Sequence, residues 1–185
     1  MRVIAGDKKG RKLVTPEGLD TRPTSDKVKE ALFSIVQFEL DGAAFLDLFA
    51  GSGQMGIEAL SRGAERAVFV DNGRKPCECI RKNLSDLSLS DRAEVNMRDI
   101  SDYLFSCKEE FDVIFLDPPY KDGVSQNLLE SVVAVAKETA VIICEIPEKS
   151  PIREECAGFS LRRRYRYGKT ELALFRRSDS ESEIY

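Results

Sequence analysis

Short apolar runs alternate with amphipathic stretches over most of this 185-residue chain. The apolar runs have the length of strands, and the stretches between them repeat apolar residues at the spacing of a helix. We expect strands over residues 44–50, 66–71, 92–97, 111–117 and 140–146. Strands that alternate with helices predict an α/β fold, in which a mostly parallel sheet carries helices on both faces.

The stretches between the strands predict the helices. In the segment that follows RPTSD, the apolar residues Val28, Leu32 and Ile35 fall on one helical face, with Thr24 or Ser25 as the N-cap. Further helices are expected over residues 55–63, 75–87 and 124–138. The last segment, residues 159–177, alternates like an antiparallel hairpin that turns at Gly168.

The length of the chain suits one sizeable core. We expect a single domain over residues 1–177, of which residues 1–22 form a basic hairpin extension, and a disordered acidic tail over residues 178–185. No apolar run has the length of a membrane span, and the first residues lack the apolar core of a signal peptide. We therefore expect a cytoplasmic protein with no membrane partner, and a monomer by default.

Composition removes several kinds of chemistry. The chain has no histidine, which excludes Ser-His-Asp and Cys-His mechanisms and histidine-ligated zinc. Its five cysteines form no C-x-x-C pair, so we expect no metal site. Catalysis would have to come from carboxylates, backbone groups or a cofactor that brings its own reactivity.

A glycine-rich segment joins the strand at residues 44–50 to the next helix. Gly51, Gly53 and Gly56 have the spacing G-x-G-x-x-G, and Asp71 ends the next strand 20 residues after Gly51, where it could accept both hydroxyls of a ribose. Asp47 precedes the glycines, where a carboxylate would meet an ammonium group and repel a pyrophosphate. S-adenosylmethionine fits both acids, because it carries an ammonium group for Asp47 and a ribose for Asp71. The alternative is a glycine-rich turn beside an acid that only ends a strand.

The strand at residues 111–117 ends in the motif DPPY. Ligands of such sheets bind beyond the carboxyl ends of the strands, where the strand order reverses, so Asp117 is expected beside the glycine loop. The Asp117 carboxylate and the Pro118 carbonyl are acceptors that suit an amino group, and Tyr120 could stack on a base. The alternative is a stiff turn that only ends the strand.

Two basic segments stand out against a net charge of −4. The N-terminal segment carries Arg2, Lys8, Lys9, Arg11 and Lys12, which could bind RNA phosphates. The C-terminal segment carries Arg162, Arg163, Arg164, Arg166 and Lys169. Alternate side chains of a strand face opposite ways, so only some of these can meet one surface.

Five segments together resemble the RsmD family, bacterial methyltransferases of guanine N2 in 16S ribosomal RNA. The segments are IAGDKKGRKL, RPTSDKVKEALF, LDLFAGSGQMGIEALSRGA, LDPPY and YGKTELALF, and they follow the family's order from Arg2 to about Phe175. The resemblance implies a Rossmann-like class I methyltransferase with a seven-stranded sheet. It also implies S-adenosyl-L-methionine as the cofactor and the small ribosomal subunit as the partner.

The resemblance assigns roles to individual residues. It assigns cofactor binding to Asp47, Phe49, Gly51, Ser52, Gly53, Asp71, Asn72, Asp99 and Ile100, with Arg22 and Thr24 near the methionine end. The catalytic motif is Asp117, Pro118, Pro119 and Tyr120. The basic N-terminal segment would dock the RNA while the target guanine is extruded into the DPPY pocket.

Three other functions are compatible with parts of the pattern. A protein glutamine-amide methyltransferase would be expected to carry NPPY, where this chain has Asp117. An adenine-N6 methyltransferase also uses DPPY, but on DNA it normally needs a further target-recognition region, for which 185 residues leave little room. A non-catalytic ribosome-assembly or RNA-binding module is the third alternative, although the intact glycines and DPPY disfavour it.

Overall fold

The computed structural model describes residues 1–15, 25–119 and 124–179. Their strands form one sheet in the order β3-β2-β1-β4-β5-β8-β7-β6. The parallel strands are β1 (Ala44–Leu48), β2 (Arg66–Asp71), β3 (Ala93–Met97), β4 (Phe111–Leu116) and β5 (Ala136–Pro147). The antiparallel strands are β6 (Glu155–Cys156), β7 (Phe159–Tyr167) and β8 (Thr170–Arg177). The strand order reverses between β1 and β4, as the sequence predicts.

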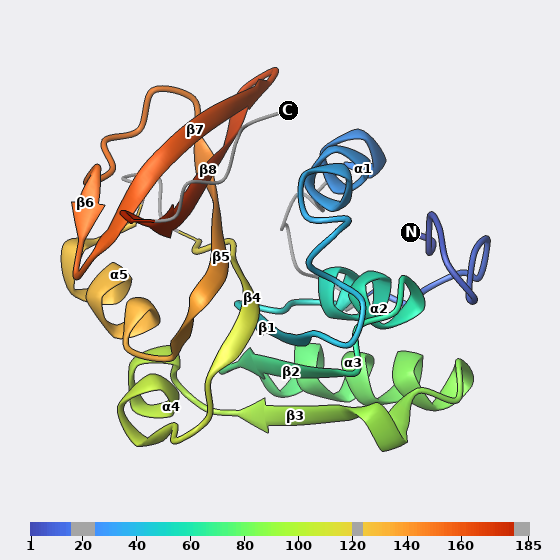
Figure 1. The fold of residues 1–185 in the computed structure, drawn as a ribbon. Helices are drawn as coiled ribbons and strands as arrows, with labels where there is room; N and C mark the ends of the chain where they lie inside the picture. Colours follow the sequence, from blue (N-terminus) through green and yellow to red (C-terminus); the bar gives the residue numbers. More distant parts are fainter. Residues whose placement is uncertain (16–24, 120–123, 180–185) are drawn as a thin grey trace.

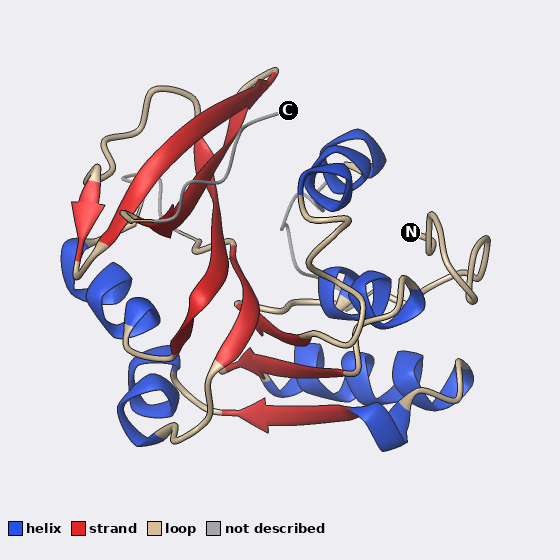
Figure 2. Ribbon diagram, in the orientation of Figure 1, coloured by secondary structure: helices blue, strands red, loops and turns tan. Residues whose placement is uncertain are grey.

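Helices cover both faces of the sheet (Figures 1 and 2). The helices are α1 (Asp26–Ile35), α2 (Gln54–Ser61), α3 (Arg74–Asp86), α4 (Ile100–Ser106) and α5 (Gln126–Val133), with a 3₁₀ turn at Ser90–Arg92. One core lies between the sheet and α1, α2 and α3, and the other lies between the sheet and α4 and α5. No helix in the described ranges is both long and apolar enough to span a bilayer.

Burial on both faces explains the near-continuous apolar runs of the central strands. In β1 the side chain of Phe45 packs into the core beside α1, and its neighbours Leu46 and Leu48 pack into the core beside α4 and α5. All five residues of β1 are buried, including Asp47. The helices start at caps that the sequence supplies: the Ser25 side chain accepts a hydrogen bond from the backbone N–H of Val28 (3.3 Å). Thr24, the other expected cap, lies outside the described residues.

Four features differ from the sequence expectation. The sheet has eight strands rather than seven, because the two-residue strand β6 adds to its edge. The helix expected over residues 124–138 ends at Val133, and Lys137 instead lies in β5 and forms an ion pair with Asp112 (2.8 Å). Pairing with β4 therefore outweighs helix propensity at this position. The seven-residue helix α4 was not expected.

The fourth difference concerns the N-terminal hairpin, which has no extended strands. One bridge joins Arg2 to Lys12, and the backbone N–H of Val3 donates to the carbonyl of Arg11 (2.9 Å). Val3 and Leu13 are buried in the core beside α1 and α2. Residues 16–22 of the predicted extension, and residues 180–185 of the predicted tail, lie outside the described residues.

A buried ion pair holds this hairpin on α1 and α2. The Glu58 carboxylate accepts hydrogen bonds from the backbone N–H groups of Ile4 (2.8 Å) and Ala5 (2.9 Å). The Lys29 ammonium lies 3.8 Å from Glu58 and donates to the carbonyl of Arg2 (2.6 Å). Both charged side chains are completely buried, and burial lowers the pKa of Lys29. The N-terminus therefore lies beside α2 (Figure 1) as a fixed part of the structure.

Candidate functional site

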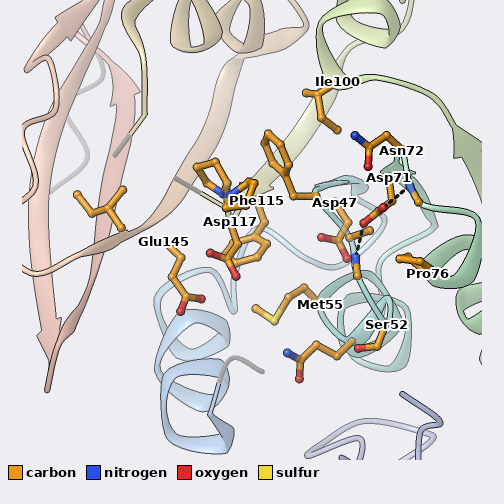
Figure 3. Close-up of a pocket in the computed structure, with 18 of the residues that line it drawn as sticks. Asp47, Ser52, Met55, Asp71, Asn72, Pro76, Ile100, Phe115, Asp117 and Glu145 are labelled. Carbon is orange, nitrogen blue, oxygen red and sulfur yellow. Dashed lines mark hydrogen bonds between the residues drawn. The ribbon is translucent and has the colours of Figure 1, made fainter. Parts of the chain in front are cut away.

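A cavity of about 1070 Å³ lies at the carboxyl ends of β1, β2, β4 and β5. Further wall residues come from the N-terminus, α1, the glycine loop before α2, the starts of α3 and α4, α5 and the turn between β7 and β8. Its position coincides with the reversal of strand order between β1 and β4, where α/β sheets bind their ligands. Figure 3 shows several acidic side chains directed into this space from neighbouring strands.

Besides Asp99, four carboxylates line the cavity, one from each of four adjacent parallel strands. They are Asp71 (β2), Asp47 (β1), Asp117 (directly after β4) and Glu145 (β5). Each follows a residue packed in the core beside α4 and α5, so the alternation of a strand directs all four to the opposite face.

The strand register sets their depths. Leu48 pairs with Val70 and with Leu116, and Leu116 pairs with Cys144. The residues that follow these partners, Asp71, Asp117 and Glu145, therefore emerge at one level of the sheet edge. Asp47 lies two residues deeper, opposite Phe69 and Phe115. Asp47 therefore lies at the bottom of the cavity, and Asp71, Asp117 and Glu145 lie along its rim.

Asp47 is the most deeply placed of these acids. Its side chain is buried, and its Oδ2 accepts a hydrogen bond from the backbone N–H of Gly56 in α2 (2.9 Å). Burial raises the pKa of Asp47 well above its usual range, and the nearby charges of Asp71 and Asp117 raise it further, against the opposing effect of the Gly56 bond. A cationic group in the cavity would stabilise the ionised form of this acid.

Asp71 ties two turns together. One carboxylate oxygen accepts from the backbone N–H of Gly51 (2.9 Å), and the other accepts from the backbone N–H of Gly73 (2.8 Å). Each oxygen keeps a second lone pair, so the carboxylate can still accept the two hydroxyls of a ribose. Asp71 therefore shapes the glycine loop and also presents acceptors to the cavity.

The backbone of the glycine loop is unusual at several positions. Gly51 and Gly53 have φ angles of 55° and 75°, and Phe49, which lacks the freedom of glycine, has a φ of 62°. Strained residues of this kind gather at functional sites. Gly56 serves packing instead, since a Cβ there would lie 2.3 Å from the ring of Phe69. The G-x-G-x-x-G pattern thus combines a tight turn with close contact between helix and strand.

Asp117 and Glu145 form a pair of acids at the other side of the cavity (Figure 3). Burial of Asp117, and secondly the negative charge of Glu145, raise the pKa of Asp117 to about 7. Such a shift marks a candidate functional residue. Pro118, which follows, is buried, and Pro119 is exposed; both line the cavity. Tyr120 of the DPPY motif lies outside the described residues.

Most of the other predicted cofactor residues that the structure describes also line the cavity. They are Phe49, Gly51, Ser52, Asn72, Asp99 and Ile100. Asp99 also caps α4, because its carboxylate accepts from the backbone N–H of Ser101 (2.8 Å). Gly53 is not among the lining residues and lies against Ile80 and Phe69 instead. Arg22 and Thr24 fall outside the described residues.

Several lining residues escaped the sequence analysis as site residues, among them Glu145, Tyr167, Lys169 and Gln54. Glu145 lies inside an apolar run that predicts only a strand, and Tyr167 and Lys169 flank the hairpin turn after β7. Gln54 begins α2; it is buried, and its Oε1 has no hydrogen-bond partner within the described part of the chain. For Glu145 a signal existed, namely an acid within a buried strand, although the register that brings it beside Asp117 was unknown.

The five basic residues predicted to bind RNA all lie on the N-terminal hairpin, and none lines the cavity among the residues described. Three of them have contacts within the chain: Arg2 lies 3.4 Å from Asp26, Lys8 lies 3.3 Å from Asp7, and Arg11 donates to the carbonyl of Asp86 (3.1 Å). The side chains in these contacts are exposed to different degrees. The five basic residues together place positive charge at one end of the molecule. No metal-binding group of three or more His, Cys, Asp or Glu side chains occurs within the described ranges.

Comparisons with known proteins agree across the chain. The family model described as "Conserved hypothetical protein 95" matches residues 1–176. YlbH of Bacillus subtilis (strain 168) is 40% identical over 182 residues, which cover 96% of this chain and 99% of that protein. "Ribosomal RNA small subunit methyltransferase D" of Escherichia coli (strain K12) is 34% identical over 180 residues, which cover 96% of this chain and 90% of that protein.

The fold has close relatives among solved structures. "Putative methyltransferase yhhF" from Escherichia coli superposes with a TM-score of 0.86 at 31% identity, covering 97% of this chain and 99% of that one. The prediction of a Rossmann-like class I methyltransferase fold is confirmed, with the eighth strand as a small addition to the sheet.

Proposed function

Because the chain belongs to the family described as Conserved hypothetical protein 95, the RsmD family, we propose that it is an S-adenosyl-L-methionine-dependent methyltransferase that acts on the exocyclic N2 amine of a guanine in 16S ribosomal RNA. The observation that carries this proposal is the placement of Asp117 on the rim of the cavity that begins at the glycine loop. Escherichia coli methyltransferase D, named for the small-subunit ribosomal RNA, supports the substrate class. We further propose that the substrate is presented within the small ribosomal subunit and that the enzyme works there as a cytoplasmic monomer.

The cavity fits S-adenosylmethionine by its charge. Five carboxylates line the cavity, which favours a ligand with a sulfonium and an ammonium and disfavours a pyrophosphate. Asp47, together with the unpartnered Oε1 of Gln54, would accept from the ammonium end, and Asp71 would accept from the ribose hydroxyls. Asp99, Ile100 and Asn72 would surround the adenine. When bound, S-adenosylmethionine supplies an electrophilic methyl group.

Asp117 and Pro118 would position the amine. The lone pair of an exocyclic amine is delocalised into the base, so the nitrogen is a weak nucleophile. A carboxylate and a backbone carbonyl that accept its two N–H bonds would hold the nitrogen with its lone pair directed away from them. Well-oriented reactants can gain on the order of 7–11 kcal/mol, so positioning alone would provide much of the catalysis.

The N-terminal hairpin would dock the RNA. Arg2, Lys8, Lys9, Arg11 and Lys12 gather on a segment that the buried Glu58–Lys29 pair holds in place. Contacts to phosphates would supply sequence-independent affinity, while the cavity selects the base. The hairpin is held on α2, and α2 follows the glycine loop. Bound RNA and bound cofactor would therefore be supported by the same helix.

Methyl transfer from labelled S-adenosylmethionine tests the proposal. Purified protein and its Asp117→Ala variant would be offered small ribosomal subunits from a strain that lacks the family enzyme, naked 16S RNA, duplex DNA and a release-factor protein. We expect label in guanine N2 of the small subunit, and loss of that label with Asp117→Ala.

The other outcomes would each contradict a different part of the proposal. Label only in DNA or protein would overturn the substrate and keep the fold and cofactor. Bound S-adenosylmethionine with no label in any substrate would favour a non-catalytic assembly module.

A further inference from the structure

Glu145 is placed where a second acceptor for the substrate base would be needed. It lies on β5, next to β4, and follows Cys144, whose pairing partner Leu116 precedes Asp117. Glu145 and Asp117 therefore emerge side by side from adjacent strands, and both carboxylates are directed into the cavity (Figure 3). Glu145 lies on the far side of Asp117 from Asp47 and Asp71, the acids assigned to the cofactor.

The surroundings of Glu145 are those of a substrate pocket. Next to it the cavity is lined by Pro147 at the end of β5 and by Tyr167, Lys169 and Thr170 around the β7–β8 turn. Tyr167 offers an aromatic face and Lys169 a positive charge, the two features that a stacked nucleotide with its phosphate requires. The part of the cavity next to Glu145 is therefore the part that a base would occupy.

The purine bases differ at the edge that two adjacent acceptors would meet. Guanine presents its N2 amino group beside the N1–H, so it offers adjacent hydrogen-bond donors. Adenine presents an amino group beside an unprotonated N1, which is an acceptor and would be repelled by a carboxylate. Two neighbouring carboxylates consequently match guanine and mismatch adenine.

We propose that Glu145 is a specificity-determining residue that accepts a hydrogen bond from the N1–H of the target guanine while Asp117 accepts from its N2 amine. This inference rests on the proposed function, and it names the contact that selects the base. The neighbouring acids also repel each other, and a base that donates to both would relieve that repulsion. The raised pKa of Asp117, caused by burial and secondly by the charge of Glu145, is consistent with two carboxyl groups that lie close together.

A substitution combined with a base analogue tests this contact. The methylated guanine would first be mapped with the unaltered enzyme, and subunits would then be reconstituted with 2-aminopurine at that position. 2-Aminopurine keeps the amine at position 2 but has an unprotonated N1. Glu145→Gln keeps the shape of the side chain and adds an N–H₂ group that can donate to this N1.

The unaltered enzyme should strongly prefer guanine to 2-aminopurine, because a site built to bond a substrate N–H rejects an analogue that lacks it. In Glu145→Gln, the ratio of kcat/KM for guanine to kcat/KM for 2-aminopurine should fall by roughly tenfold or more. Both substrates are compared on one preparation, so a smaller folded fraction cancels from the ratio. Asp71→Asn makes the same acid-to-amide change on the cofactor side and should lower both rates together.

The outcomes separate this inference from the function on which it rests. A narrowed ratio in Glu145→Gln alone supports the contact. Methylation by the unaltered enzyme with the same ratio in Glu145→Gln would overturn the role of Glu145 and leave the function standing. If the unaltered enzyme methylates no RNA, the proposed function fails and the role of Glu145 fails with it.

Discussion

The chain carries two basic hairpins, and their charges are used differently. At the N-terminus, the basic side chains lie on the outside of a turn whose backbone is fixed by Glu58 and Lys29. At the C-terminus, the arginines of β7 bond within the sheet. Arg164 contacts Glu171 and donates to the carbonyl of Ser150 (2.9 Å), and Arg166 lies 2.7 Å from Glu148.

The difference shows that a run of basic residues does not by itself identify a nucleic-acid surface. In the C-terminal hairpin, carboxylates of the same chain pair with Arg164 and Arg166, and Arg162 donates to the carbonyl of Arg177 (2.6 Å). In the N-terminal hairpin the anchoring charges are buried and distinct from the exposed ones. Stability and RNA binding should therefore respond to separate sets of substitutions.

Removing the buried anchor should have the largest effect. Glu58→Ala leaves the Lys29 ammonium buried without its partner and two backbone N–H groups without their acceptor. We expect the free energy of unfolding to fall by about 3–5 kcal/mol, measured by urea denaturation. Lys29→Met combined with Glu58→Gln removes both charges and should cost less than Glu58→Ala alone. If the double variant is the less stable of the two, the buried charges do not depend on each other.

Two glycines of the N-terminal hairpin form a matched pair for the next prediction. Gly6 and Gly10 have φ angles of 80° and 81°, but a Cβ at Gly6 would lie 1.7 Å from the carbonyl oxygen of Ser61, whereas Gly10 faces open space. Gly10→Ala should cost about 1 kcal/mol from backbone strain alone. Gly6→Ala should cost about 2–4 kcal/mol, because it adds a clash with α2.

Thermal unfolding would measure both glycine variants, and methyl transfer to small subunits would report on docking. Activity should fall in Gly6→Ala and persist in Gly10→Ala. Equal losses in the two variants would mean that contact with α2 does not hold the hairpin.

Charge removal at the two hairpins should give opposite results. Replacing Lys8, Lys9 and Arg11 together with alanine should lower activity on RNA roughly tenfold and flatten its salt dependence, with cofactor affinity and stability unchanged. Arg164→Ala should instead lower stability by about 1–2 kcal/mol, through loss of bonds to a charged group, and should leave the salt dependence alone. Titration calorimetry with S-adenosylmethionine supplies the control; loss of cofactor affinity in the triple variant would contradict a separate docking element.

Local patterns explain how much of the fold and site the sequence could predict. The strand runs, the glycine spacing and the acids at Asp71 and Asp117 all depend on residues near each other in the chain, and the structure places β1 beside β4, so that Asp117 lines the same cavity as the glycine loop. Glu145 could not be placed, because its position beside Asp117 depends on the register between β4 and β5. The pairing of Arg164 with Glu171 depends on the register between β7 and β8 in the same way.

The C-terminal end of α5 was predicted wrongly for a related reason. Residues 134–138 continue the helical pattern of α5, but β5 begins at Ala136, which pairs with β4, so residues 136–138 lie in the strand. The two-residue strand β6 has too few residues for any periodic signal. The end of α5 was thus missed because a long-range contact outweighs a local preference.

The smallest predicted effect is a pH dependence of activity, which should arise at the reaction site and not at the docking surface. Asp117 has a pKa raised to about 7, and its ionised form is the acceptor for the amine, so activity should fall as the pH drops through this value. Going from pH 8 to pH 7, we expect about a twofold loss in kcat/KM, since half of the groups are protonated at their pKa. The basic residues of the N-terminal hairpin lie outside the cavity, so the salt dependence should not change with pH.

Because Asp117 interacts with the neighbouring Glu145, the inflection belongs to the pair, and a variant must assign it. Glu145→Gln removes the negative charge that helps to raise the pKa of Asp117 and should shift the inflection to lower pH. Lys8→Ala, on the docking hairpin, should leave the inflection where it is. If the inflection stays in place in Glu145→Gln, burial alone sets the pKa of Asp117. If the inflection moves in Lys8→Ala, the docking surface and the reaction site are electrostatically coupled.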